Sequence, residues 1–203
     1  MPPKAVFFDM DGVLLDSFDA WLSVMNATAN HFGYPPIEKE AFQAIFGGST
    51  QADVDTFFPK HSVAEIEAFY AANFAGYAAA AIALPGASHI LDALDTRGIP
   101  TAVITNTHST IARPLLESLG LIPNALVAAD NVGNPKPAPD MIFRACEILN
   151  VEPWDVMIVG DSVFDQQAAA AAGVSFVGFG GITGNFTLSS LEDVLNLVDG
   201  AYH

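Results

Sequence analysis

The sequence predicts an α/β protein, a doubly wound parallel sheet with a small helical domain inserted into it. Two observations predict this fold. From residue 85 onward, short apolar runs alternate with helical patterns of about 10 to 15 residues, which is typical of parallel βαβ units. The first apolar run, 6–8, precedes a long stretch without a convincing strand, 16–84. We therefore expect 1–15 and 85–203 to form the core, and 16–84 to form a helical cap.

The expected cap begins directly after the first strand. Apolar residues recur with helical spacing over 17–32, and Tyr34-Pro35-Pro36 ends this helix. Further helices are expected, with breaks at Gly47-Gly48 and Pro59, over 38–46, 50–57 and 62–79. No strand is expected between 16 and 84.

The rest of the core alternates between the two element types. The strands are mostly apolar, which fits a sheet covered by helices on both faces. We expect strands at 100–104, 125–128, 155–159 and 174–178, and helices at 87–97, 109–119, 138–149, 163–172 and 188–198.

The composition favours a globular protein that binds neither nucleic acid nor a membrane. The chain has 203 residues, 51% of them hydrophobic, which is enough for one good core. Seven basic and 23 acidic residues give a net charge of −16, which repels phosphate backbones and anionic lipids. No apolar stretch reaches the roughly 18 residues of a membrane span, and no signal segment is apparent. The single cysteine, Cys146, favours a reducing compartment, so we expect a cytoplasmic location. Monomer and homodimer are both compatible with the sequence.

Polar side chains gather at four of the expected strand ends. Because the carboxyl ends of parallel strands meet at one edge of a sheet, these clusters are expected to form a single site. The clusters are Asp9-Met10-Asp11-Gly12, Thr105-Asn106-Thr107, Gly133-Asn134-Pro135-Lys136-Pro137, and Gly160-Asp161-Ser162 with Asp165.

The acidic clusters predict a metal site. Asp9, Asp161 and Asp165, with Asp11 nearby, cannot share a partly buried cleft unless their charge is neutralised. A hard divalent cation with oxygen ligands achieves this, and we expect Mg²⁺.

The remaining clusters predict a phosphate site. Lys136 can hold an anionic nucleophile and a substrate oxygen together as a point charge. Thr105 and Asn106 supply a hydroxyl and an amide for further substrate oxygens. The expected partner is therefore a small phosphorylated metabolite.

The two opening aspartates are expected to have different roles. Alternation along a strand lets Asp9 and Asp11 face the substrate while Met10 packs away. Asp9, nearer the strand, is the expected nucleophile, which forms an aspartyl-phosphate. Asp11 is the expected acid and base, which protonates the leaving alcohol and then activates water.

Together these motifs resemble the haloacid dehalogenase superfamily, in its phosphoglycolate-phosphatase-like and β-phosphoglucomutase-like branch. The segments that carry the resemblance are DMDGVLLDS, ITNT, NPKPAPD and VGDSVFD, which begin at residues 9, 104, 134 and 159. The resemblance implies a Rossmann-like core with a helical cap inserted after the first segment. It also implies Thr105 as a phosphate ligand, and Mg²⁺ held by the Asp9 carboxylate, the Asp11 backbone carbonyl and Asp161. Asp165 would support the waters of the metal.

The branch contains several chemistries, and the sequence favours phosphatase activity like that of phosphoglycolate phosphatase. Asp11 argues against a dehalogenase, whose leaving group needs no proton. A phosphonate hydrolase is also disfavoured. Those enzymes lack the second aspartate and use a cap lysine, and neither Lys39 nor Lys60 is at a matching position. The alternatives are a β-phosphoglucomutase-like mutase, which the absence of arginine from 16–84 disfavours, and a non-catalytic binding protein.

A few features stay open at this stage. Gly47-Gly48-Ser49 can be a loop that faces the substrate or an ordinary turn between helices. For His108 we favour a polar loop residue over a substrate contact. Most aromatic residues of the cap are expected in its core: Trp21, Phe42, Phe46, Phe57, Phe58, Tyr70, Phe74 and Tyr77.

Overall fold

The computed structural model describes residues 2–200, and its centre is a parallel sheet. The six strands lie in the order β5-β4-β1-β6-β7-β8, and every pair of neighbours is parallel. The strands are β1 (Ala5–Phe8), β4 (Thr101–Thr105), β5 (Ala125–Ala128), β6 (Val156–Gly160), β7 (Ser175–Gly178) and β8 (Phe186–Thr187). The predicted doubly wound α/β fold is thereby confirmed.

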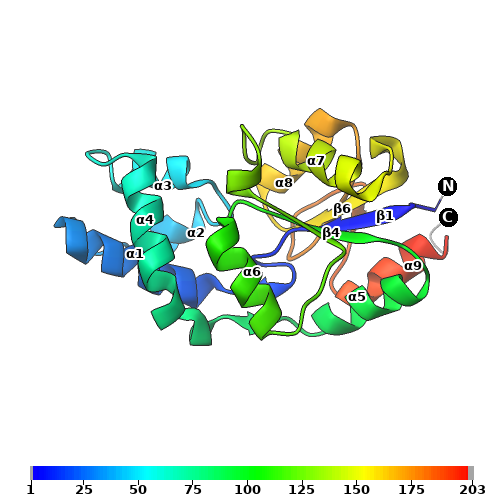
Figure 1. Ribbon diagram of the computed structural model, residues 1–203, viewed down its shortest axis with the longest axis horizontal. Coiled ribbons are helices and arrows are strands. Elements are labelled where there is room, and N and C mark those ends of the chain that lie inside the picture. Colours follow the sequence, from blue (N-terminus) through cyan, green and yellow to red (C-terminus); the bar gives the residue numbers. More distant parts are fainter. Residues whose placement is uncertain (1, 201–203) are drawn as a thin grey trace.

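Helices cover both faces of this sheet (Figure 1). On one face lie α7 (Asp140–Leu149) and α8 (Val163–Ala172). The other face carries α5 (Ala87–Thr96), α6 (Ser109–Ser118) and α9 (Val194–Val198). Side chains of β1 alternate between the two layers: Val6 and Phe8 pack toward α5 and α6, whereas Phe7 packs toward α7 and α8. A strand buried on both faces is apolar throughout, which explains its sequence.

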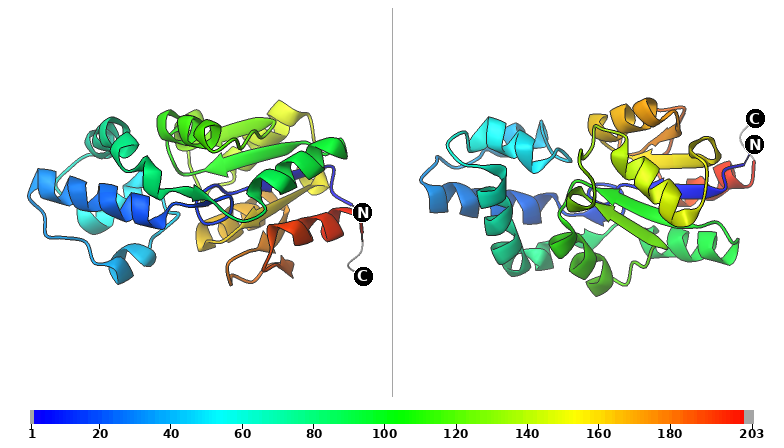
Figure 2. Two further views of the ribbon diagram at one scale, coloured as in Figure 1. Left: turned by 90° about the horizontal axis from the view of Figure 1, so that it is seen from below. Right: turned by 45° about the horizontal axis from the view of Figure 1, so that its top comes forward.

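The inserted residues 16–84, which we call the helical segment, lie beyond the carboxyl ends of the strands (Figures 1 and 2). The helices are α1 (Phe18–Phe32), α2 (Lys39–Gln43), α3 (Thr50–Phe57) and α4 (Val63–Asn73). Two 3₁₀ turns follow, Phe74–Gly76 and Ala78–Ala80, so the helix expected over 62–79 ends early. Apolar residues of this segment join the cluster that also contains Val6 and Phe8.

Two short strands corrected the expectation that 16–84 contains none. β2 (Leu15–Asp16) and β3 (Ile82–Ala83) pair antiparallel, with Leu15 opposite Ala83. A two-residue strand is too short to show alternation, and its partner lies far away in the sequence, so no local pattern predicts it. This small sheet lies where the chain enters and leaves the helical segment.

The C-terminal region also differs from the expectation. The helix expected over 188–198 is a 3₁₀ turn, Leu191–Asp193, followed by α9, and β8 precedes it at the sheet edge. The remaining 3₁₀ turns are Ala129–Asn131 and Pro153–Asp155. Among the helices of residues 2–200, none combines the length and the apolar character of a bilayer span.

Candidate active site

The carboxyl ends of three neighbouring strands position the acidic and hydroxyl groups of the site. β1 lies between β4 and β6, so Asp9, which follows β1, has Thr105 on one side and Asp161 on the other. Asp9 and Thr105 are buried, and Asp161 is partly exposed. The four sequence clusters thus meet at one edge of the sheet.

Lys136 is the only lysine among residues 2–200 that is buried, and it joins two aspartates. Its Nζ lies 2.7 Å from Asp9 Oδ1 and 2.7 Å from Asp165 Oδ1, and it donates to the Ile104 carbonyl at 3.1 Å. Burial by itself would lower the pKa of Lys136, but Asp165 and Asp9 raise it well above its usual value. The lysine is therefore charged at neutral pH.

Asp9 uses one of its two oxygens for these contacts. Oδ1 accepts from Lys136 and from the Met10 amide, the latter at 2.7 Å. Burial raises the pKa of Asp9 well above the usual value, and Asp165 raises it further, against the opposing charge of Lys136. One lysine thus does not balance the negative charge at this edge.

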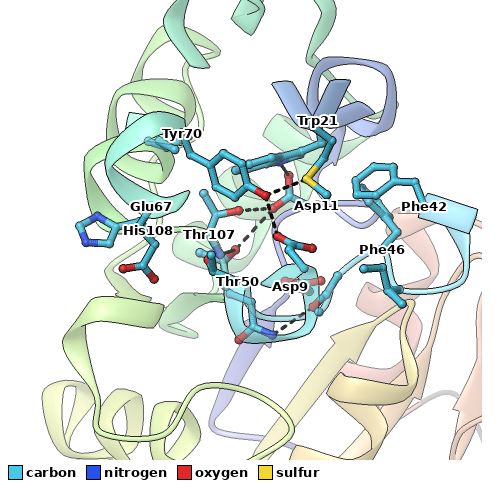
Figure 3. Close-up of a pocket in the computed structure, with 18 residues that line it drawn as sticks. Asp9, Asp11, Trp21, Phe42, Phe46, Thr50, Glu67, Tyr70, Thr107 and His108 are labelled. Atoms are coloured by element: carbon cyan, nitrogen blue, oxygen red, sulfur yellow. Dashed lines mark hydrogen bonds between the residues drawn. The ribbon is translucent and has the colours of Figure 1, made fainter. Parts of the chain in front are cut away.

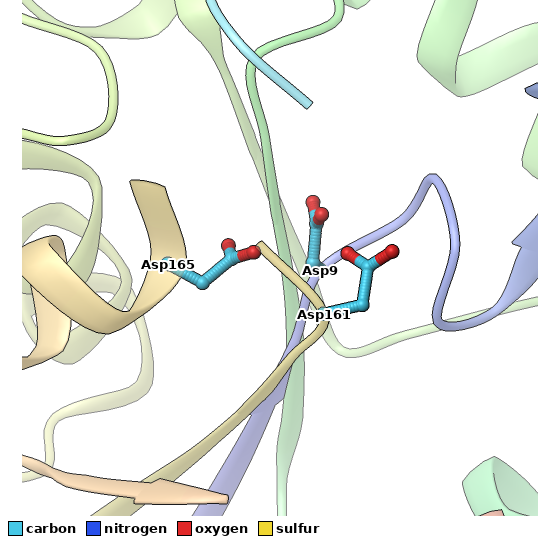
Figure 4. A group of neighbouring side chains, drawn as sticks. All are labelled: Asp9, Asp161 and Asp165. Carbon is cyan, nitrogen blue, oxygen red and sulfur yellow. The ribbon is translucent and has the colours of Figure 1, made fainter. Parts of the chain in front are cut away.

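Asp9, Asp161 and Asp165 offer three carboxylate oxygens that lie within 4.8 Å of one another (Figure 4). Burial, and then Asp165, raise the pKa of Asp161 to about 7. Oxygen donors with excess negative charge are the environment that a hard cation such as Mg²⁺ requires, so the residues fit this metal.

The oxygens of Asp165 are already occupied. Oδ1 faces Lys136, and Oδ2 accepts from the Ser162 amide at 3.1 Å and from its hydroxyl at 2.5 Å, which forms the capping box of α8. Asp165 therefore positions Lys136 and the start of α8, which leaves Asp9 and Asp161 with the more accessible oxygens.

Asp11 has a different environment, made of neutral donors. Oδ1 accepts from the Ser17 hydroxyl at 2.5 Å and the Trp21 indole N–H at 3.2 Å. Oδ2 accepts from the Thr107 hydroxyl at 2.8 Å, with the Thr105 hydroxyl at 3.5 Å. No cation contacts this carboxylate among residues 2–200, so the two opening aspartates are held in different ways.

Sequence reasoning missed Trp21 and Thr107 as partners of Asp11. A signal existed for the first: Ser17 and Trp21 are four residues apart at the start of a helix, so they lie on one face. Thr107 is part of the ITNT segment, but the choice between its hydroxyl and that of Thr105 depends on the turn after β4. In that turn the Thr107 amide donates to Thr105 Oγ1 at 3.0 Å.

Asn106 connects the core to the helical segment. Its Nδ2 donates to the Lys136 carbonyl and to the Gly47 carbonyl, both at 3.0 Å. Its Oδ1 is buried and accepts no hydrogen bond from residues 2–200. The Asn106 Nδ2 hydrogens thus connect the loop that contains Lys136 to the loop that contains Gly47, and Oδ1 is the atom of this amide without a partner among residues 2–200.

A cavity of about 50 Å³ lies between the helical segment and the edge of the sheet that carries Asp9 and Asp11 (Figure 3). Trp21, Phe42, Phe46 and Tyr70 line it, and Trp21, Phe42 and Tyr70 are also buried in the apolar cluster, as expected for aromatic residues of the cap. Gly47 and Gly48 also line it, which decides the open alternative in favour of a loop that faces the site. The further lining residues are Asp9, Asp11, Met25, Ile45, Thr50, Asp53, Glu67, Thr105, Asn106, Thr107, His108 and Ile111.

Comparison with known proteins agrees with this geometry. The sequence model of the haloacid dehalogenase-like hydrolases matches residues 6–179. A phosphoglycolate phosphatase of Chromobacterium violaceum is 30% identical over 188 residues, covering 87% of this chain and 85% of that protein. An N-acetylmuramic acid 6-phosphate phosphatase of Pseudomonas putida is 29% identical over 177 residues, covering 84% and 79%.

A solved structure shares the architecture over nearly the whole chain. The crystal structure of a haloacid dehalogenase superfamily hydrolase, subfamily IA, from Geobacter sulfurreducens superposes with a TM-score of 0.79 at 27% identity. The match covers 96% of this chain and 99% of that one. The overall architecture described above is thus shared with a hydrolase of known structure.

Proposed function

The chain belongs to the haloacid dehalogenase-like hydrolase family and is a phosphatase, and we propose that it hydrolyses a small phosphorylated metabolite with Mg²⁺ through an aspartyl-phosphate. One observation carries the proposal: Lys136 ion-pairs with Asp9 at 2.7 Å, next to a second carboxylate, Asp161, that lies within metal-sharing distance. A nucleophile, its counter-charge and a place for a cation are thereby combined in one site.

The first step uses the free oxygen of Asp9. Because Oδ1 is held by Lys136 and the Met10 amide, Oδ2 attacks phosphorus. A new Asp9–phosphorus bond forms, and the bond from phosphorus to the ester oxygen breaks. The leaving alkoxide takes a proton from protonated Asp11. The resulting Asp11 carboxylate accepts hydrogen bonds from the hydroxyls of Ser17 and Thr107 and from the Trp21 indole.

The second step reverses these roles. A water molecule loses a proton to the Asp11 carboxylate and attacks the phosphorus of the aspartyl-phosphate. The Asp9–phosphorus bond breaks, which releases inorganic phosphate and restores both aspartates. Thr105, whose hydroxyl lies beside Asp11, Asn106 and Lys136 bind phosphate oxygens in both steps, and the Asn106 side chain also donates to the Lys136 carbonyl.

Asp9 and Asp161, with the backbone carbonyl of Asp11, would hold the metal. When bound, Mg²⁺ supplies the positive charge that lets a phosphate dianion approach the Asp9 carboxylate. Asp165 keeps Lys136 and the first turn of α8 in place around these ligands.

We divide the chain into a core, 1–15 and 85–203, and a cap, 16–84, with the β2–β3 pair at the boundary. The cap closes the cavity over the core, which excludes water during the first step. We place the reaction in the cytoplasm, because the lone Cys146 suits a reducing compartment. A mutase is disfavoured, since none of the residues that line the cavity is Lys or Arg and a second phosphate needs such a partner.

The Asp9→Asn variant tests the mechanism. The amide is a poor nucleophile, so phosphate release should fall by a factor on the order of 10⁴ or more, while the fold is retained. In wild-type protein quenched with acid during turnover, mass spectrometry should find phosphate on the peptide that contains Asp9. Chelation by EDTA should stop turnover, and Mg²⁺ should restore it.

The matched control is Asp16→Asn, which changes an exposed aspartate of the same segment and should leave turnover unchanged. Full activity of Asp9→Asn, or phosphate trapped on a different residue, would refute the nucleophile assignment.

A further inference from the structure

The wall of the cavity that faces the catalytic aspartates is itself acidic. We propose that Asp53 and Glu67 select the leaving group, so that this phosphatase prefers phosphomonoesters whose far end carries a hydroxyl or ammonium donor and rejects those that end in a carboxylate. The inference rests on the proposed phosphatase function and concerns its substrate class.

Asp53, on α3, is partly buried and accepts one hydrogen bond. The Tyr70 hydroxyl donates to its Oδ2 at 3.1 Å, and this hydroxyl also lies 2.8 Å from Met25 Sδ. The Tyr70 ring packs edge-on against Trp21 with centroids 5.6 Å apart, and Figure 3 shows its hydroxyl directed toward the interior of the cavity. Asp53 is thus held at the cavity by an aromatic scaffold.

No basic side chain neutralises this wall. Among residues 2–200, neither Asp53 nor Glu67 forms an ion pair, and Lys39 instead lies over the Phe18 ring at 5.3 Å. Burial raises the pKa of Asp53 to about 7, partly offset by the Tyr70 hydrogen bond. Among residues 2–200 the Asp53 carboxyl group therefore has a hydroxyl partner but no charged one, which a ligand with a positive or donor group can provide.

Asn106, which also lines the cavity, contributes no accessible donor to this wall. Asn106 is 8% exposed, and its enclosed Oδ1 accepts no hydrogen bond from residues 2–200. Its Nδ2 already faces two carbonyl oxygens, so exchanging the two amide atoms would place oxygen against oxygen. Because Asn106 Oδ1 is enclosed, the acceptors that the cavity offers a ligand here are the carboxyl groups of Asp53 and Glu67 on the helical segment.

A carboxylate at the far end of the substrate would meet like charge. It would approach Asp53 and Glu67, and like charges brought together in a desolvated site repel strongly. The one cavity-lining histidine, His108, directs Nε2 toward Asp130 at 3.7 Å and Nδ1 toward the Thr110 hydroxyl at 3.0 Å. The prediction therefore separates this chain from the phosphoglycolate phosphatase to which it is similar, because phosphoglycolate ends in a carboxylate.

Four two-carbon phosphates of nearly equal size test the proposal on the full chain with Mg²⁺. They are 2-hydroxyethyl phosphate, phosphoethanolamine, ethyl phosphate and 2-phosphoglycolate. At about pH 8.5, where a carboxyl group with a pKa near 7 is ionised, kcat/KM for the hydroxyl and ammonium compounds should exceed that for phosphoglycolate by about tenfold or more. The relative values for hydroxyl and ammonium identify which donor is preferred.

Asp53→Asn separates recognition from the intrinsic reactivity of each ester. The ratio of kcat/KM for phosphoglycolate to that for 2-hydroxyethyl phosphate should rise about tenfold in this variant, and leaving-group differences cancel in the comparison. Glu67→Gln repeats the test at the second carboxyl group, should the first variant fold poorly. Asp55→Asn, on the same helix but exposed, should leave the ratio unchanged. A wild-type preference for phosphoglycolate, or ratios unmoved in both variants, would overturn the inference.

Failure of the proposed function has a different signature. In that case none of the four esters, nor p-nitrophenyl phosphate, releases phosphate from the folded protein. The affinities of the Asp9→Asn protein for phosphoethanolamine and for 2-phosphoglycolate, measured by calorimetry, still test the inference, because binding needs no turnover. Tighter binding of phosphoethanolamine supports it, and tighter binding of phosphoglycolate contradicts it.

Discussion

Both walls of the cavity carry carboxyl groups, but the groups differ in how many partners stabilise them. On the core wall, Asp9 faces the ammonium group of Lys136, and Asp11 accepts hydrogen bonds from side chains that include Ser17 and Trp21. On the wall of the helical segment, Asp53 accepts a hydrogen bond from the Tyr70 hydroxyl and forms no ion pair with any of residues 2–200. Carboxylates that are fixed by partners are suited to catalysis, because catalysis needs groups in defined positions. A carboxylate without a counter-charge is suited to ligand recognition, because the ligand can supply the missing partner.

The largest effect is expected from removing the Lys136 counter-charge on the core wall. Lys136→Met leaves Asp9 and Asp165 buried without their counter-charge, so the free energy of unfolding should fall by about 3–5 kcal/mol, together with loss of turnover. Urea denaturation in the presence of a chelator measures the first quantity, since added metal would partly replace the lost charge.

Lys4→Met is the matched control for this variant. Lys4 pairs with Asp155 at the same distance, 2.7 Å, but the lysine side chain is 69% exposed, so its removal should cost no more than about 1 kcal/mol. Equal losses for the two variants would show that burial does not set the importance of the Lys136 pair.

The second effect compares two glycines with left-handed backbones, one in each region. Gly12 has φ +86° and Gly33, at the end of α1, has φ +74°. Substitution by alanine strains both backbones by about 1 kcal/mol. Only at position 12 would the new Cβ collide with the Asp161 carboxylate, since nothing lies within 4 Å at position 33. Gly12→Ala should therefore also lower turnover at saturating Mg²⁺, whereas Gly33→Ala should only lower thermal stability. Normal turnover of Gly12→Ala would exclude a tight approach of this loop to Asp161.

A third effect concerns the wall of the helical segment and depends on pH. Burial raises the pKa of Asp53 to about 7, above the value of about 3.9 in an unfolded chain, so the folded state favours the protonated form. This contribution to stability is complete below pH 4 and is lost as the pH rises through 7, where the carboxyl group must ionise in place. The stability of Asp53→Asn relative to wild type should therefore increase between pH 5 and pH 8.

Urea midpoints at the two pH values measure this change, with Asp55→Asn as the exposed control on the same helix. A pH-independent difference between Asp53→Asn and wild type would mean that the Asp53 carboxyl group is well solvated.

Much of the fold was predictable because its elements are locally encoded. β5 and α8 lie at the predicted residues, and the other core strands are shifted by a single residue at most of their ends. The family and the phosphatase class also followed from the sequence, because residue types at strand ends identify the chemistry before any distance is known. The errors, which are β2, β3, β8, the early end of α4 and the helix expected over 188–198, occur where short elements depend on contacts with distant residues.

The site divides in the same way. The sequence by itself determined which residues could do chemistry, since aspartates, a lysine and hydroxyls after apolar strands leave few other interpretations. Only the tertiary structure decided how their atoms are used: Asp9 Oδ1 faces a lysine 127 residues away, and the Asn106 amide reaches Gly47 in the helical segment. It also placed Asp53 and Tyr70 in the lining of the cavity that Asp9 and Asp11 line from the core. The physical reason is that strand and helix preferences act over a few neighbouring residues, whereas burial, charge pairing and cavity shape depend on segments that meet only when the chain is folded.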